Sequence, residues 1–195
     1  MSSEGEIRPG HRLDRYELIC PIAEGGMARV WIARQLGKHG FEKLVAIKTI
    51  LPALASDVRF QQMFLDEARL ASAIEHTNVA RILDVGEEHE VLYIVMEWID
   101  GESLNHVQRS LARTGVAIPN GVLLRVMADV CAGLHAAHEL RDRSGKLACV
   151  VHRDVSPQNI LISTDGVSKI IEFRTRSDRV RSSRACSPSD RTRPW

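Results

Sequence analysis

Apolar and polar residues form short alternating runs over roughly the first half of the chain and change to helical spacing afterwards. The short runs are separated by glycine-containing turns, which is typical of strands in an antiparallel meander. We expect five such strands, at residues 16–22, 30–35, 44–50, 80–85 and 91–97. Between the third and the fourth, apolar residues from Phe60 to Ile74 recur at helical spacing, and Pro52 and Asp57 mark the start. This half therefore predicts a five-stranded antiparallel sheet with one helix.

The second half has a predominantly helical pattern. Ser103 is a suitable N-cap for a short helix, and Pro119 with Asn120 opens a longer one. The longer helix carries one apolar stripe, made of Val122, Val126, Val130 and Leu134. Short β-type runs are expected at residues 149–151, 160–162 and 169–171. A mostly β half followed by a mostly α half predicts the fold class α+β.

Composition narrows the classes of protein to which the chain can belong. At 195 residues, 44% of them hydrophobic, it is long and apolar enough for one packed domain. The formal net charge of +1 gives no general attraction to nucleic acid, so we expect no specific nucleic-acid partner. The N-terminus is polar and no apolar run reaches about 18 residues, so we expect no signal peptide, no membrane span and a cytoplasmic location. The four cysteines lack CxxC spacing, which favours buried thiols over a zinc site or disulfides.

A glycine-rich turn lies between the first two predicted strands, at residues 24–28. Gly25 and Gly26 would let backbone amides approach an anion closely, because glycine has no Cβ, although an ordinary hairpin turn has the same pattern. The third strand carries Lys48 at the end of VAIK, where an ammonium among apolar residues needs a partner to offset its desolvation. Glu67, on the predicted helix, is the candidate partner.

The segment VHRDVSPQNIL places Asp154 and Asn159 five residues apart on one tight loop. A carboxylate can act as a base, and an amide oxygen can bind a hard cation such as magnesium. This pair suits phosphoryl transfer, which depends on positioning and charge neutralisation more than on covalent catalysis. The HRDxxxxN pattern is specific, and here it follows a glycine-rich loop and VAIK in that order.

On these motifs the chain resembles the eukaryotic-like (Hanks-type) bacterial serine/threonine protein kinases over residues 13–173. The resemblance implies a two-lobed fold, with a complete small lobe and hinge at residues 13–99 and part of the large lobe at residues 100–173. A flexible lead at residues 1–12 and a disordered tail at residues 174–195 would flank the two lobes. The resemblance also implies ATP and Mg²⁺ as cofactors, and a protein with a serine or threonine hydroxyl as the partner.

The resemblance further implies roles for individual residues. Lys48 would contact the α- and β-phosphates of ATP with Glu67 as its partner, and Asp154 would orient the substrate hydroxyl and accept its proton. Asn159 would bind magnesium, with Glu172 at the position of a second metal ligand. The implied nucleotide-binding positions comprise the glycine-rich loop, the neighbouring strand, a gatekeeper at Met96 and the hinge: Ala23, Gly25, Gly26, Ala28, Val30, Ala46, Lys48, Met96, Glu97 and Ile99.

The chain departs from the family pattern at several of these motifs. Ala23 and Ala28 replace two loop glycines, a small steric change that nucleotide binding should survive. Ser156 stands where serine/threonine kinases usually have a lysine, and the lost charge-assisted contact could be worth roughly 1.5–3 kcal/mol. Glu172 and Arg174 replace the aspartate and glycine of the DFG motif. Glutamate is one methylene longer than aspartate, and arginine does not reach positive φ as cheaply as glycine.

The regular pattern ends at Phe173. Residues 174–195 contain seven arginines and five serines but no Leu, Ile, Phe or Met, and neither an activation segment nor an APE motif follows. A displaced reading frame or a premature end would account for the change, and the alternative is a genuine disordered basic extension. Three functions remain open: a serine/threonine kinase impaired by these changes, a pseudokinase-like module that binds nucleotide or a partner, and a kinase fragment without a function of its own.

Overall fold

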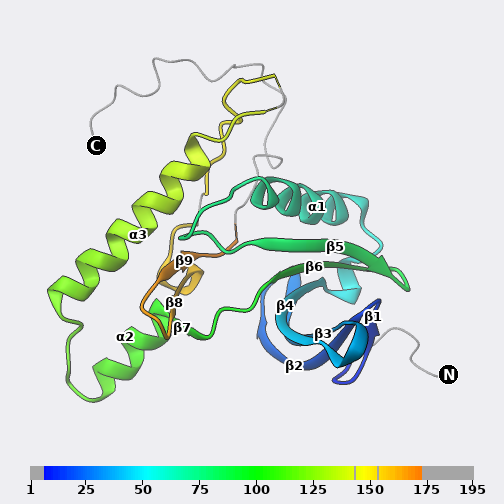
Figure 1. The fold of residues 1–195 in the computed structure, drawn as a ribbon, viewed down its shortest axis with the longest axis horizontal. Coiled ribbons are helices and arrows are strands. Elements are labelled where there is room, and N and C mark those ends of the chain that lie inside the picture. Colours follow the sequence, from blue (N-terminus) through cyan, green and yellow to red (C-terminus); the bar gives the residue numbers. More distant parts are fainter. Residues whose placement is uncertain (1–6, 143, 153, 173–195) are drawn as a thin grey trace.

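The computed structural model describes residues 7–142, 144–152 and 154–172 (Figure 1). The N-terminal part is a curled sheet with the strand order β1-β2-β3-β4-β6-β5, in which all neighbours are antiparallel. Its strands are β1 (Arg12–Leu13), β2 (Tyr16–Glu24), β3 (Ala28–Leu36), β4 (Glu42–Ile50), β5 (Ile82–Glu88) and β6 (Val91–Glu97).

The two faces of this sheet bury different apolar clusters, because side chains alternate along each strand. One face contributes Trp31, Val45 and Val95 to a cluster on the side of the sheet away from the helix. The other face packs against helix α1 (Val58–Ser72), through a cluster that includes Ile50 and Ile94. Lys48 belongs to this second face, since it lies two residues from Ile50 on β4.

Helix α1 is fixed at its start and along one side. The side chain of Asp57 accepts a hydrogen bond from the backbone N of Arg59, which caps the first turn. Phe64 and Ala68 are buried against the sheet. Because Glu67 follows Phe64 by three residues, it lies on nearly the same side of the helix and faces β4.

The C-terminal part consists of two helices and a small antiparallel sheet with the strand order β7-β8-β9 (Figure 1). The elements are β7 (Gly101–Ser103), α2 (Leu104–Arg113), α3 (Asn120–His138), β8 (Ile160–Ser163) and β9 (Ser168–Ile170). A short 3-10 helix, Pro157–Asn159, precedes β8. Helix α3 packs against β9 through a third apolar cluster that includes Val130 and Ile170.

The expected elements are present, with several corrections. The fourth strand begins at Ile82 rather than at residue 80, and the sheet gains β1, which is too short to produce an alternating pattern. No strand forms at residues 149–151, because Cys149 has a φ of +53°, outside the β region. Val122 is 49% exposed, so the buried stripe of α3 begins one turn later, at Val126.

The expected flexible lead at residues 1–12 does not describe the residues next to β1. Ile7 is buried in the same cluster as Trp31, and β1 begins at Arg12. An isolated apolar residue next to Pro and Gly gives no periodicity, so this packing has no signal in the sequence. Residues 1–6 and the tail at 174–195 lie outside the described residues. Among the helices described, none is both long enough and apolar enough to cross a membrane.

Helix α3 approaches its neighbours so closely at Gly133 that a larger residue should not fit. A Cβ at this position would lie 2.8 Å from the backbone O of Asn78. We expect Gly133→Ala to lower the free energy of unfolding by about 1–3 kcal/mol, as overpacking does elsewhere. Gly121→Ala is the matched control on the same helix, because a Cβ there meets nothing within 4 Å. Chemical denaturation of both variants would check this, and equal stabilities would contradict it.

Candidate active site

The ammonium of Lys48 lies between two carboxylates. Its Nζ is 2.8 Å from Oε1 of Glu67 on α1 and 3.1 Å from Oε1 of Glu172, just after β9. Burial disfavours the charged amine, but the attraction of the two carboxylates outweighs it, so the pKa of Lys48 is raised. Lys48 therefore stays protonated, and it joins the N-terminal sheet to the C-terminal part of the chain.

The loop that precedes β8 positions Asp154 and Asn159 through backbone contacts. Nδ2 of Asn159 donates to the backbone O of Asp154 at 3.0 Å, so its Oδ1 is the side-chain atom left to face a cation. The backbone O of Asn159 accepts a hydrogen bond from the N of Ile171 at 3.0 Å. This bond ties the loop to the segment that carries Glu172. Asn159 is buried, whereas Asp154 is partly exposed.

His152 supports this loop and was not among the sequence-predicted site residues. Its Nδ1 accepts a hydrogen bond from the backbone N of Asp154 at 3.3 Å, and Nε2 lies 3.2 Å from the backbone O of Ile171. A neutral imidazole with its proton on Nε2 satisfies both contacts. Burial lowers the pKa of His152, consistent with this neutral form. The available signal was its place in the HRD motif, two residues before Asp154.

The glycine-rich turn closes the hairpin between β2 and β3. The N of Gly25 donates to the O of Ala28 at 2.9 Å, and a Cβ at Gly26 would meet nothing within 4 Å. Packing inside the described chain therefore does not require glycine at position 26, which leaves room above the turn for a ligand.

Several predicted nucleotide-binding residues share the sheet face of Lys48. Val30 is the cross-strand partner of Lys48, and Ala23 is the partner of Val30. Ala46, two residues before Lys48, pairs with Met96. Cross-strand partners project from the same face, so these side chains line a surface next to the ammonium.

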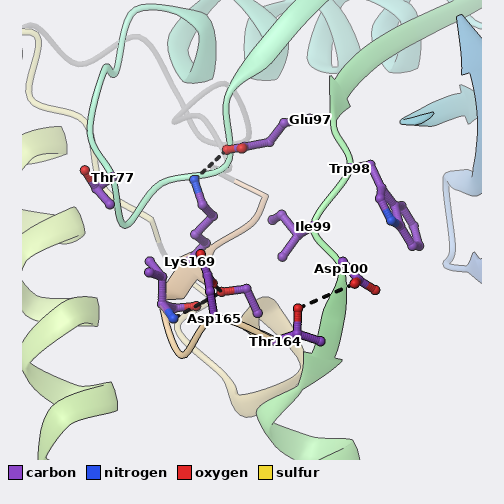
Figure 2. Close-up of a pocket in the computed structure, with 10 residues that line it drawn as sticks. Thr77, Glu97, Trp98, Ile99, Asp100, Thr164, Asp165 and Lys169 are labelled. Atoms are coloured by element: carbon purple, nitrogen blue, oxygen red, sulfur yellow. Dashed lines mark hydrogen bonds and ion pairs between the residues drawn. The ribbon is translucent and has the colours of Figure 1, made fainter. Parts of the chain in front are cut away.

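The predicted hinge, residues 97–99, connects the two parts of the fold. The carboxylate of Glu97 accepts hydrogen bonds from Nζ of Lys169 at 2.8 Å and from the backbone N of Arg81 at 2.9 Å. A cavity of about 400 Å³ lies beside the hinge. Figure 2 shows Glu97, Ile99 and Lys169 among the residues that line it. Neither Lys48 nor the loop with Asp154 lines this cavity, so it is separate from the arrangement described above.

The donor set fits a magnesium nucleotide better than a metal ion held by protein alone. Within the described ranges, no group of three or more His, Cys, Asp or Glu side chains could hold a metal. Magnesium commonly uses one or two protein oxygens together with phosphate oxygens and water, a demand that Asn159 and Glu172 can meet. Oγ of Ser156 is buried without a hydrogen-bond partner among the described residues, so it is available to a phosphate oxygen.

The structure thus brings Lys48, Glu67 and Glu172 into direct contact and connects them to the catalytic loop. Two hydrogen bonds provide the connection: the backbone N of Ile171 donates to the O of Asn159, and Nε2 of His152 donates to the O of Ile171. Arg174 and Phe173 lie outside the described residues.

Comparison with known proteins identifies the family. The family model for the protein kinase domain matches residues 16–190. The match extends beyond Phe173, where the regular pattern was expected to end. The chain is 41% identical over 158 residues to the tyrosine-protein kinase MasK of Myxococcus xanthus, covering 81% of the chain and 24% of that protein. It is 35% identical over 169 residues to the serine/threonine-protein kinase PknB of Mycobacterium tuberculosis, covering 85% of the chain and 25% of PknB. The chain therefore spans about a quarter of the length of these curated relatives.

Solved structures show the same fold. The C20A mutant of the PknI kinase domain of Mycobacterium tuberculosis superposes with a TM-score of 0.65 at 25% identity, covering 86% of this chain and 63% of that chain. The apo form of PpkA-294 superposes with a TM-score of 0.69 at 23% identity, covering 87% of this chain and 62% of that chain. The two-part α+β architecture is therefore that of a kinase domain.

Acidification should destabilise the folded chain in part through His152. An unfolded histidine titrates near pH 6.5, about where free imidazole side chains do, whereas burial keeps folded His152 neutral to lower pH. The unfolded state then binds more protons as the pH falls through that region, so the free energy of unfolding falls with it. We expect a shallower fall in His152→Gln than in the wild type, measured by chemical denaturation at a series of pH values. His138→Gln, at an exposed histidine, is the matched control, and equal slopes in wild type and His152→Gln would contradict the expectation.

Proposed function

The chain belongs to the protein kinase domain family, and we propose that it binds MgATP and transfers the γ-phosphate to a serine or threonine hydroxyl of a protein. The observation that carries this proposal is the pair of contacts at Lys48, 2.8 Å from Glu67 and 3.1 Å from Glu172. A lysine held in this way presents a fixed cation to the phosphates of a nucleotide. In this proposal residues 13–99 act as the small lobe with the hinge, and residues 100–173 as part of the large lobe.

Each residue of the site then has a distinct task. The backbone of the glycine-rich turn and Lys48 hold the phosphates, while the backbone of residues 97–99 holds the adenine. Asn159 and Glu172 would hold magnesium, which supplies neutralisation of the charge on the phosphate oxygens. Asp154 orients the acceptor hydroxyl and takes its proton as the new oxygen–phosphorus bond forms, while the bond from the γ-phosphorus to the bridging oxygen breaks and ADP leaves. His152 keeps Asp154 in place through the backbone bond to its Nδ1.

The burial of the chain's own tyrosines favours serine and threonine as sites of autophosphorylation. PknB is named as a serine/threonine kinase, whereas MasK is named as a tyrosine kinase, so the names of relatives alone leave the choice open. The chain has two tyrosines, Tyr16 and Tyr93, which are 2% and 1% exposed and whose hydroxyls donate to Asp84 and Asp14. Autophosphorylation of the folded chain would therefore have to use a serine or a threonine.

A module that binds nucleotide without transferring phosphate is the second candidate. Glu172, in place of the family's aspartate, is already paired with Lys48, and Ser156 provides no cation for the transferring phosphoryl. Both features weaken transfer more than they weaken nucleotide binding.

A fragment that needs further large-lobe helices is the third candidate. Leu124 and Met127 on α3 are 70% and 46% exposed, next to Val122. Contiguous apolar side chains of this kind are usually covered in a complete domain. A broad, poorly cooperative unfolding transition would support this candidate, and a sharp transition of the monomer would count against it.

Asp154→Asn should abolish transfer and spare nucleotide binding. An amide cannot take the proton of the acceptor hydroxyl, so we expect the transfer rate to fall by roughly 10²–10⁴-fold. Asp165→Asn, at an exposed turn residue, is the matched control. The measurement is incorporation of labelled phosphate into a generic protein substrate, followed by identification of the phosphorylated amino acid, beside a calorimetric titration with MgATP. If the wild type binds MgATP but transfers no phosphate, the second candidate function is correct instead. If the product is phosphotyrosine, the proposed serine or threonine acceptor is wrong.

Glu172→Asp should improve the metal site. The shorter carboxylate restores the side chain that the family has at this position, and magnesium accepts poor ligand geometry reluctantly. We expect a lower magnesium concentration for half-maximal ATP binding and a higher rate of transfer. Glu67→Asp, which shortens the other carboxylate beside Lys48, is the matched control and should not lower the magnesium requirement. An unchanged or higher requirement in Glu172→Asp would show that Glu172 does not hold the metal.

A further inference from the structure

The strand β9 is held by side chains from two elements that are distant in the sequence, and it leads directly to Glu172. We propose that Asn78 and Asp129 form a clamp on β9 that positions the carboxylate of Glu172 against Lys48. Asn78 and Asp129 are then positioning residues of the nucleotide site. The role in nucleotide binding rests on the proposed function, whereas the placement of Glu172 does not. We call Asn78 and Asp129 the β9 clamp.

Asn78 holds β9 through both its side chain and its backbone. It lies in the segment between α1 and β5 and is 8% exposed. Its Nδ2 donates to the backbone O of Ser168 at 2.8 Å, and its backbone O accepts a hydrogen bond from the N of Ile170 at 2.9 Å. The N of Ala80 donates to the O of Ile170 at 2.9 Å and continues the pairing.

Asp129 holds the start of the same strand from helix α3. Its Oδ2 accepts a hydrogen bond from the backbone N of Ser168 at 3.2 Å, and its Oδ1 accepts one from Nε of Arg125 at 2.9 Å. The residue is 7% exposed. Burying a carboxylate lowers stability unless hydrogen bonds or ion pairs satisfy its oxygens. The bonds to Ser168 and Arg125 satisfy both oxygens of Asp129 and fix it against the start of β9.

Close packing keeps the two halves of the clamp together. At Gly133, one turn after Asp129, a Cβ would lie 2.8 Å from the O of Asn78 and 3.1 Å from Cδ1 of Ile170. The helix, the segment with Asn78 and the strand therefore meet without a gap, and β9 cannot shift toward α3. Figure 1 shows β9 between α3 and the strands of the N-terminal sheet.

The position of Glu172 follows from this arrangement because only Ile171 separates it from β9. The backbone of Ile171 is bonded to Asn159 and His152, so the chain from Ser168 to Ile171 is held at successive peptide groups. Glu172 has a φ of +62°, a conformation that non-glycine residues adopt only when their surroundings impose it. A shift of β9 would therefore move Ile171 and Glu172 with it and disrupt the 3.1 Å contact between Glu172 and Lys48.

A purely structural role of the clamp would lower stability without any specific effect on Glu172. If the clamp instead positions Glu172, its loss should also remove the contribution of Glu172 to stability. Residues that are far apart and independent have additive effects on stability, whereas coupled residues do not. A double-mutant cycle between Asn78→Ala and Glu172→Gln therefore separates the two, and it needs no nucleotide.

The cycle is measured by chemical denaturation of the whole chain without nucleotide. We expect Glu172→Gln to lower the folding equilibrium constant several-fold in the wild type but less than twofold in Asn78→Ala, because Glu172 would no longer face Lys48. Asp129→Ala should behave like Asn78→Ala. Asp129→Asn keeps an acceptor for the N of Ser168 and should restore most of the coupling.

Two control variants separate the clamp from a general loss of packing. Val130→Ala removes a buried side chain of α3 that belongs to the apolar cluster but not to the clamp, and Ser168→Ala alters β9 while its backbone bonds remain. In both, Glu172→Gln should have its full effect. Equal effects of Glu172→Gln in the Asn78→Ala and Val130→Ala backgrounds would overturn the clamp.

A magnesium titration of ATP binding tests the link to function. If the double-mutant cycle shows coupling, Asn78→Ala should raise the magnesium concentration for half-maximal ATP binding several-fold, and Val130→Ala should not. If the wild type binds no MgATP although the cycle shows coupling, the clamp stands and the proposed function fails. If the wild type binds MgATP but the cycle shows no coupling, the clamp fails and the proposed function stands.

Discussion

The ammonium of Lys48 is buried, and the folded chain has to compensate its charge. A cation inside a sheet face is stable only when carboxylates compensate the loss of water, and β4 itself offers none beside it. The two that do so, Glu67 and Glu172, come from α1 and from the segment after β9. Lys48 therefore connects the N-terminal sheet, its helix and the C-terminal part of the chain at one point.

This arrangement places two demands on Glu172. It compensates the charge of Lys48 in the folded chain, and in the proposed function it would also hold magnesium. A phosphate-bound metal and Lys48 would both attract the same carboxylate, so the longer side chain of glutamate has a physical consequence. It can reach Lys48 from a backbone with positive φ, but it has more freedom than the geometry of magnesium favours.

The residues around Lys48 occur in the order that protein kinase domains share. Membership of the protein kinase domain family accounts for the order of the glycine-rich turn, Lys48, Glu67 and the HRDxxxxN loop along the chain. The chain covers 63% of one solved PknI kinase domain and about a quarter of the curated relatives. The charged contacts around Lys48 nevertheless form among described residues, because all their members lie between Lys48 and Glu172.

The features that depend on neighbours along the chain followed from the order of the amino acids alone. The alternation of β2 to β6, the capping of α1 by Asp57 and of α2 by Ser103, and the spacing of Asp154 and Asn159 were all predictable, since each depends on a few consecutive residues. The partnership of Lys48 with Glu67 also followed from the need of a buried cation for a counter-charge. Only the tertiary structure decided that Glu172 shares this ammonium, that His152 holds Ile171, and that Asn78 and Asp129 hold β9. These contacts join residues 19 to 124 positions apart, and no local pattern records which faces of the chain will pack together.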